Sequence, residues 1–233
     1  MSGLGIDRNA RRMNVGVRQA ASKVLIKGAN IRRGLDSAGG AVALTFDDGP
    51  DPRYTVEVLD ELARLGIRAT FFLVGEQARA NPSIVRRMVA DGHDIGSHSC
   101  SHPEPWRLGL RDLMVEYRRG RSLVEHAAEQ TVRLFRPPKG YVSAKGALAM
   151  LAARVRPWLW TIDPCDWEPN ASAQHIVAGC SNLAAGDVVL LHDAIKGPLA
   201  PSALDRSATC ASLSAIAALA RSRQLRFTTL TQS

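Results

Sequence analysis

The chain has 233 residues, which suits a single domain because α/β barrels often have about 200 to 250 residues in one piece. Hydrophobic residues make up 45% of the chain, enough for a substantial core. The net charge is +8, but residues 1–38 hold eight Lys/Arg against two Asp, which is +6 of that total. The remaining body is therefore close to neutral, and we expect no nucleic-acid partner.

The basic N-terminal extension, residues 1–38, has Val24-Leu25-Ile26 as its longest apolar run. This run is too short for the apolar core of a secretory signal peptide or for a membrane span. We therefore expect a cytoplasmic protein. Gly39-Gly40 marks the boundary to a catalytic domain at residues 39–233, and we expect the extension to be dispensable for chemistry.

The extension has helical spacing over part of its length. The apolar residues that share one helical face are Met13, Val17, Ala20, Ala21 and Val24. One interpretation is an amphipathic helix in weak contact with an anionic membrane surface. The other is a helix packed on the body, with its basic residues in water. We favour the second, because the face has no Trp, no Phe and no set of Leu residues.

Beyond Gly40, short apolar runs alternate with helical patterns. The expected strands are Ala41–Phe46, Ala69–Val74, Asp94–Gly96, Val132–Phe135, Trp158–Ile162, Val188–Leu191 and Arg226–Leu230. The expected helices precede Gly66, follow Asn81-Pro82 to Ala90, and lie near residues 110–129, 143–155, 172–184 and 207–222. This alternation predicts an α/β fold, a distorted (β/α) barrel with about seven parallel strands.

Five polar clusters each follow an apolar run. They are TFDDGP at 45–50, HSCSH at 98–102, RPPKG at 136–140, DPCDW at 163–167 and LLHD at 190–193. In α/β barrels the chemistry is built at the C-terminal ends of the strands. Adjacent carboxylates, two histidines four residues apart and a later histidine are the components of a metal-dependent hydrolase.

The first two clusters supply candidate metal ligands. Asp47 and Asp48 precede a Gly-Pro turn, so one carboxylate can bind a metal while the other faces a substrate water. His98 and His102 are spaced so that one tight turn brings both imidazoles to the same side. Two His and one carboxylate leave coordination positions open for water and substrate. The same set suits non-haem iron, so these ligands alone do not fix the metal.

The later clusters supply candidate catalytic groups. Arg136 could neutralise one carboxylate of the pair, and the stiff Pro137-Pro138 turn could direct a backbone N–H at an oxyanion. Asp163 and His192 end consecutive expected strands, so we expect them in contact. A carboxylate partner would hold His192 protonated near neutral pH, as a general acid requires.

The five motifs, in this order, resemble those of the NodB-homology polysaccharide deacetylases, carbohydrate esterase family 4, over residues 40–233. The resemblance implies a distorted barrel and a divalent metal, usually zinc, with cobalt or another divalent ion as alternatives. It assigns Asp47 as the catalytic base, held by Arg136, with Asp163 tuning the general acid His192. The implied metal ligands are Asp48, His98 and His102.

The resemblance also implies a substrate groove. Its expected lining is Trp167, Leu191, Pro138 and Tyr141, and the backbone N–H of Lys139 is expected to hold the oxyanion. The family often has Tyr or Phe where Lys139 stands, so this side chain is a departure that bears on which acidic or neutral sugar binds nearby. Cys100 and Cys165 lie inside motifs and are expected to remain free thiols.

We therefore expect a metal-dependent amidase that removes acetyl from an N-acetylated amino sugar in an oligo- or polysaccharide. The alternatives are a peptidoglycan N-acetylglucosamine deacetylase, and a deacetylase of a lipid-linked sugar or natural-product intermediate. A non-enzymatic alternative is an inactive carbohydrate-binding domain, which the loss of a ligand or of the base would favour. None of these residues is missing from the sequence.

Overall fold

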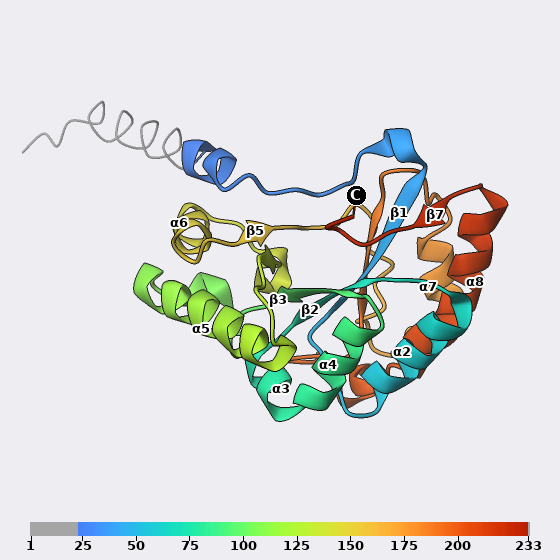
Figure 1. Ribbon diagram of the computed structural model, residues 1–233, viewed down its shortest axis with the longest axis horizontal. Coiled ribbons are helices and arrows are strands. Elements are labelled where there is room, and N and C mark those ends of the chain that lie inside the picture. Colours follow the sequence, from blue (N-terminus) through green and yellow to red (C-terminus); the bar gives the residue numbers. More distant parts are fainter. Residues whose placement is uncertain (1–22, 233) are drawn as a thin grey trace, which may run out of the picture.

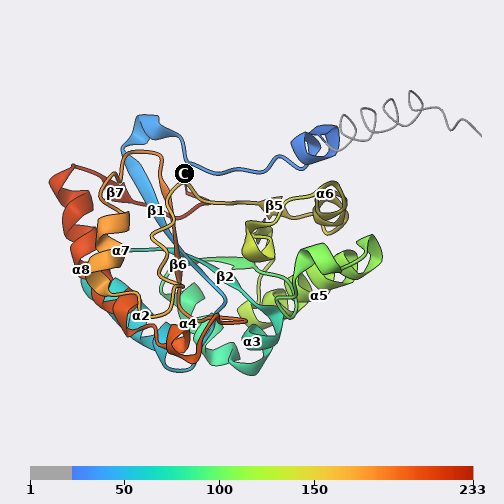
Figure 2. The same ribbon diagram turned by 180° about the vertical axis from the view of Figure 1, so that it is seen from behind.

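The computed structural model describes residues 23–232, and Figures 1 and 2 show a curled parallel sheet with helices around its outside. The strands are β1 (Ala41–Asp47), β2 (Thr70–Leu73), β3 (Asp94–Ser97), β4 (Leu134–Phe135), β5 (Arg156–Pro157), β6 (Val188–His192) and β7 (Arg226–Phe227). The helices are α2 (Tyr54–Leu65), α3 (Gly75–Ala80), α4 (Pro82–Ala90), α5 (Leu110–Ala128), α6 (Ala144–Ala152), α7 (Ala173–Gly179) and α8 (Ser207–Ser222). The 3-10 turns are η1 (Ser37–Gly39), η2 (Pro105–Arg107), η3 (Pro138–Gly140) and η4 (Pro201–Leu204).

The strands are all parallel and follow the order β5-β4-β3-β2-β1-β6, with β7 paired to the start of β1. In the described part of the chain, one isolated bridge between Ile162 and Val189 joins the segment after β5 to β6. The predicted distorted barrel with about seven parallel strands is thus confirmed, and the sheet is not closed, because β5 and β6 do not pair as strands.

Two local predictions differ from the structure. The fifth strand is short and ends before Trp158, because the chain from there to Ile162 crosses from β4 to β6 and cannot pair with either along its whole length. Helix α3 has no counterpart among the expected helices, because its sequence GEQARA lacks an apolar stripe. Asn81 stands directly before α4, as expected, and its side-chain amide donates to the Gln77 and Pro50 carbonyls.

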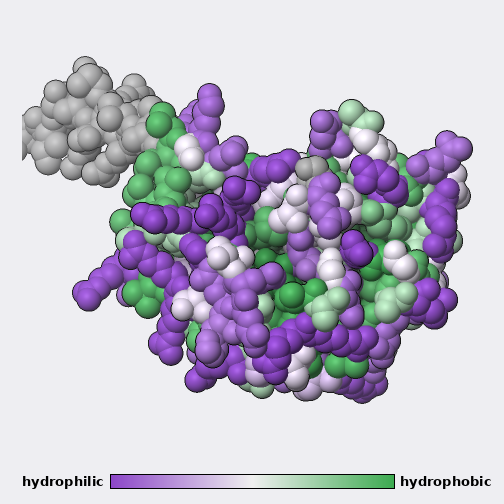
Figure 3. Space-filling view, viewed as in Figure 1, coloured by the Kyte–Doolittle hydropathy of each residue, from purple (hydrophilic) through white to green (hydrophobic). Residues whose placement is uncertain are grey.

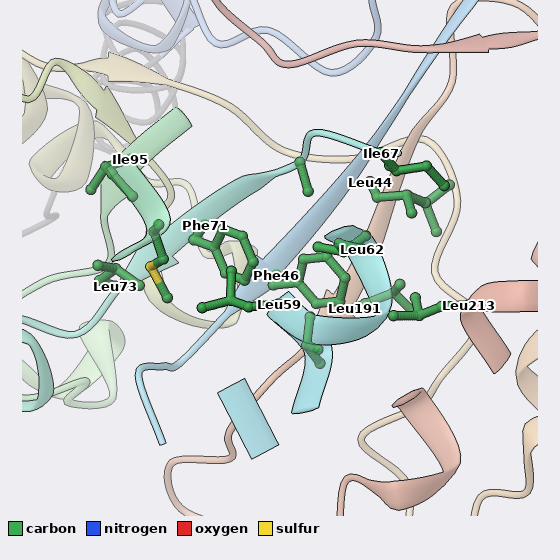
Figure 4. Close-up of a cluster of buried hydrophobic side chains, with 14 of the residues drawn as sticks. Leu44, Phe46, Leu59, Leu62, Ile67, Phe71, Leu73, Ile95, Leu191 and Leu213 are labelled. Carbon is green, nitrogen blue, oxygen red and sulfur yellow. The ribbon is translucent and has the colours of Figure 1, made fainter. Parts of the chain in front are cut away.

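Alternate residues of each strand face opposite sides of the curled sheet. On β1, Val42, Leu44 and Phe46 join the outer core, and Ala43 belongs to a separate inner cluster. In Figure 4, Phe46 stands beside Phe71 of β2, while leucines of α2, α8 and β6 close over the same outer side. Thr45 and Asp47 share the inner side with Ala43, which places a polar pair inside the barrel.

The described end of the N-terminal extension contacts the body. Residues 23–28 are helical, and Ala29 is buried in a cluster with the apolar side chains of α5 and α6. Arg32 forms a bridge with Trp158, and its guanidinium lies 4.2 Å from the Trp158 ring centroid. The interpretation of an extension packed on the body thus applies to residues 25–35. Val24 is 70% exposed, and hydrophobic colour shows in this region at the upper left of Figure 3.

The rest of the expected amphipathic face, Met13 to Ala21, lies outside the described residues, so the membrane interpretation stays a prediction. Within residues 23–232, no helix combines the length and the apolar character needed to cross a membrane.

Candidate active site

A cavity of about 440 Å³ opens at the C-terminal ends of the strands. Asp47 and His192 end neighbouring strands in register, and His98 directly follows β3. Parallel pairing therefore aligns the polar residues of separate motifs at one edge of the sheet. The cavity lining includes Asp47, Asp48, His98, His102, Lys139, Asp163, Trp167 and His192.

Three candidate metal ligands converge at the bottom of this cavity. Asp48 Oδ1 lies 3.5 Å from His98 Nε2 and 3.3 Å from His102 Nε2. One ligand atom from each residue lies within 4.8 Å of the others. All three side chains are almost completely buried.

The chemistry of these donors fits a cation. His98 Nδ1 lies 2.7 Å from the Arg136 carbonyl oxygen, which can only accept, so the proton is on Nδ1 and the Nε2 lone pair is free. Burial lowers the pKa of His102 to about 4 against the opposing charge of Asp48, so this imidazole is neutral at pH 7. Asp48 Oδ1 is buried without a hydrogen-bond partner among the described residues. Three electron-pair donors directed at one point repel one another unless a positive ion lies between them.

Asp47 stands beside this cluster and is held by Arg136. Arg136 is fully buried inside the barrel, and its Nη1 donates to Asp47 Oδ1 at 2.7 Å and to Thr45 Oγ1 at 2.8 Å. Its other nitrogens donate to the carbonyls of Trp158 and Leu159. The guanidinium is thereby fixed in place, and one oxygen of Asp47 is left to face the cavity.

The predicted contact between Asp163 and His192 is wrong. The carboxylate beside His192 is Asp166, with 2.7 Å between its Oδ1 and His192 Nδ1, and its Oδ2 accepts from the His192 backbone N–H at 2.8 Å. Asp163 instead accepts from Cys165 N and Trp167 Nε1, which holds the turn that brings Asp166 inward. The two carboxylates lie in the same motif, and the sequence does not say which one the turn buries.

The pKa of His192 favours the protonated imidazole at neutral pH. Burial works to lower its pKa, but the contact with Asp166 outweighs burial and raises the pKa to about 9. Asp166 is held in turn by Thr209 Oγ1 and, through its carbonyl, by Arg206.

Asp193, the last residue of the LLHD motif, supports the turn after β1. It is fully buried and accepts from the Thr55 hydroxyl. A Cβ added at Gly49 would lie 2.1 Å from Asp193 Oδ2, so the turn of the first motif needs glycine to pass this carboxylate.

The expected groove residues are only partly in the cavity wall. Trp167 lines it, but Leu191 does not, because strand alternation places Leu190 on the inner side with His192 and directs Leu191 into the outer core. Pro138 is a buried residue of η3, and Tyr141 packs edge-on against Trp106 with ring centroids 5.7 Å apart.

Several wall residues were missed by the sequence analysis. They are Glu104, Trp106, Trp160, Leu190, Ile195, Lys196 and Leu199. The spacing of Leu190 from His192 on one strand was a usable signal. The others lie on loops where no local pattern marks a wall residue.

Five residues of the site loops have backbone conformations in the left-handed region. Asp48, Ser99, His102, Lys139 and Cys165 all have φ between 56° and 76°. This region disfavours residues with a Cβ, by about 1 kcal/mol or more each. Four of the five motifs thus contain at least one residue that the loop conformation alone disfavours.

Comparison with known proteins agrees with this arrangement. The family model described as polysaccharide deacetylase matches residues 35–157. The chain is 36% identical over 154 residues to a chitooligosaccharide deacetylase of Sinorhizobium fredii, covering 66% of this chain and 72% of the relative. It is 34% identical over 196 residues to a peptidoglycan-N-acetylglucosamine deacetylase of Bacillus cereus, covering 82% and 86%. The chain belongs to the polysaccharide deacetylase family.

Solved structures of this family share the fold. A peptidoglycan N-acetylglucosamine deacetylase, Bc1960, superposes with a TM-score of 0.79 at 28% identity, over 89% of this chain and 94% of that one. A family 4 carbohydrate esterase from Streptomyces lividans, in complex with acetate, gives 0.70 at 35% identity over 80% and 90%. The predictions of a carbohydrate esterase family 4 fold and of a deacetylase enzyme are confirmed.

Proposed function

We propose that this chain removes the acetyl group from an N-acetylated amino sugar in an oligo- or polysaccharide and releases acetate. The observation that carries the proposal is the pairing of two groups on neighbouring strands. Asp47 is a buried carboxylate fixed by Arg136, and His192 is a histidine held protonated by Asp166. Both line the cavity that contains the Asp48 cluster.

The metal that fits Asp48, His98 and His102 best is zinc, because two imidazoles and one carboxylate are a common ligand set of catalytic zinc; cobalt fits the same donors. Bound there, the ion would acidify a water and polarise the acetyl carbonyl.

The chain's own residues supply the proton transfers. Asp47 accepts the proton of the attacking water, and Arg136 keeps its carboxylate in position. The Lys139 backbone N–H stabilises the negative charge on the acetyl oxygen. His192 gives its proton to the sugar nitrogen as the C–N bond breaks, because an amine is a poor leaving group without it. A C–O bond replaces the C–N bond, so the products are acetate and a free amino sugar.

The side walls orient the sugar. Trp167 and Leu190 offer an apolar surface for the acetyl methyl, where Leu190 takes the part predicted for Leu191. Trp106 and Trp160 offer flat faces of the kind on which sugar rings stack. Asp163 holds Trp167 in place through its indole N–H.

The relatives name two substrate classes, chitooligosaccharide and peptidoglycan. We place an oligo- or polysaccharide of the chitooligosaccharide kind first. Peptidoglycan is the second candidate, favoured by the greater length of the match to the Bacillus cereus protein. A lipid-linked sugar or a natural-product intermediate is a third possibility. The location in the cytoplasm, with or without contact to a membrane surface, stays a prediction.

Acetate release from chitooligosaccharides, peptidoglycan and N-acetylglucosamine by purified protein tests the proposal. Chelation should abolish the activity, and zinc or cobalt should restore it. Asp48→Asn should lose both metal and activity. Asp47→Asn should keep the metal and lose turnover by orders of magnitude, because the ligands remain while the base is gone. No acetate from any acetylated sugar by the zinc-loaded protein would leave an inactive binding domain as the better description.

A further inference from the structure

The charged residues around the cavity mouth are unevenly compensated. Among the described residues, Asp47 pairs with Arg136 at 2.7 Å, and Glu104 pairs with Arg107. Lys139 and Lys196 also line the cavity, yet no carboxylate of the described chain lies within ion-pair distance of either ammonium group. Two positive charges at the mouth are thus left for a ligand or for solvent.

Two carboxylates of the wall remain, Asp48 and Asp163, and neither pairs with a lysine ammonium group. Asp48 belongs to the cluster of candidate metal ligands, and Asp163 belongs to the turn that carries Trp167. Asp163 Oδ1 accepts hydrogen bonds from Cys165 N and Trp167 Nε1 at 2.9 and 3.3 Å. It is therefore committed to the turn that it stabilises, and no described cation forms a salt bridge with it.

The two lysines approach from opposite sides of the site. Lys139 follows β4 and Lys196 follows β6, and three strands of the sheet lie between β4 and β6. Lys139 is held in the left-handed region with φ of 58°, and its side chain is exposed. The Lys196 backbone N–H donates to Asp48 Oδ2 at 2.7 Å, so the loop that carries it is tied to the metal-ligand cluster. Both residues therefore have fixed backbones from which the flexible side chains reach toward a bound sugar.

We propose that the preferred substrate carries an anionic group next to the acetamido sugar, bound by the ammonium groups of Lys139 and Lys196. This rests on the proposed deacetylation and specifies its substrate class as an acidic N-acetylated glycan. A carboxylate on the sugar and a phosphate on its anomeric oxygen offer the same chemistry to an ammonium group. A neutral chitooligosaccharide remains a substrate of the same site, but it leaves both lysine charges unpaired, so the acidic derivative should bind better.

The test compares ligands that differ in charge alone. One is N-acetylchitotriose, and the other is the same trisaccharide with its C6 hydroxymethyl groups oxidised to carboxylates. Acetate release by the zinc-loaded protein gives kcat/KM for each. Lys139→Met should reduce the preference for the acidic over the neutral trisaccharide about fivefold, the upper range for a solvent-accessible ion pair. Lys139→Arg should retain the preference, and Lys196→Met should lower it. The matched control Lys23→Met, at an exposed lysine away from the cavity, should leave it unchanged.

Binding provides a readout that does not depend on turnover. Calorimetric dissociation constants for both trisaccharides are measured in an Asp47→Asn background, with and without Lys139→Met. Tighter binding of the acidic trisaccharide that weakens from about 0.05 to about 0.5 M salt supports the proposal. This binding result supports the acidic-substrate proposal even when no acetate is released. The absence of acetate would reject only the deacetylase function. Dissociation constants for N-acetylglucosamine 1-phosphate and N-acetylglucosamine, measured in the same way, decide between phosphate and carboxylate as the source of charge. Equal affinity for the charged and neutral member of both pairs, or a preference unaltered by both lysine variants, overturns the proposal.

Discussion

Replacement of Asp166 by Asn should weaken the enzyme mainly on the alkaline side of its pH profile. Asp166 is the carboxylate that raises the pKa of His192 to about 9, against burial, which acts to lower it. Without this charge, burial remains, and the pKa should fall to the ordinary 6.5 or below. The change of about 2.5 pKa units corresponds to about 3.4 kcal/mol.

This shift predicts a loss that grows with pH. At pH 8, a histidine with a pKa near 9 is about 90% protonated, and one with a pKa of 6.5 about 3%, so activity should fall about 30-fold. At pH 7 the same shift should reduce activity only about fourfold. An activated aryl acetate, whose leaving group needs no proton, should be affected less than an N-acetyl sugar.

The assay is kcat/KM for acetate release between about pH 5.5 and 10, with zinc content and thermal unfolding measured in parallel. Asp163→Asn is the matched control, since it makes the same substitution three residues away on a carboxylate that contacts Trp167 instead of His192. A variant at Asp166 that keeps the basic limb near pH 9, or a variant at Asp163 that moves it, would refute this assignment of the two carboxylates.

Three further outcomes are expected. A truncated chain that begins at Ser37 should have a free energy of unfolding about 3 kcal/mol or more below that of a chain that begins at Lys23, because it lacks three backbone hydrogen bonds formed by Arg32 and Leu35; equal urea midpoints would show that residues 23–36 do not contribute to stability. Burial lowers the pKa of His93 to about 4, so its contribution to stability is complete above pH 6.5 and is lost as the pH falls toward 4. His93→Gln removes this titrating group, so the free energy of unfolding should fall less between pH 6.5 and 4, by up to about 3 kcal/mol. An unchanged loss over the same pH range, measured by urea titration at each pH, would contradict the burial argument. Gly140→Ala would place a Cβ 2.5 Å from Trp160 at a φ of +60°, so it should raise KM for the glycan with zinc content unchanged, and an unaltered KM would remove Trp160 from the binding wall.

The sequence was sufficient for the parts of the molecule that local patterns determine. Strand runs such as Val188–Leu191 were recognisable because strands of a parallel sheet are buried on both sides and are therefore continuously apolar. The spacing of His98 and His102 was informative because the turn that contains them is short. Asp48 could be placed beside them because parallel strands align their C-terminal ends.

Distant contacts were not predictable in the same way. Whether Asp163 or Asp166 faces His192 depends on a turn stabilised by an indole N–H, and both are polar residues of one short motif. Leu190 and Leu191 are identical in type, and only the two-residue spacing of Leu190 from His192 on β6 indicates which of them faces the cavity. The bridge of Arg32 to Trp158 joins the extension to the body across more than a hundred residues of sequence, and no local pattern indicates it.

The left-handed residues of the site loops affect how this protein can be improved. Asp48 and His102, two of the candidate metal ligands, each have a backbone conformation that glycine would adopt more easily. A screen that scores thermal tolerance alone would therefore reward glycine at these positions and accumulate well-folded, inactive chains. Laboratory evolution of this enzyme should select for survival at high temperature and for acetate release together.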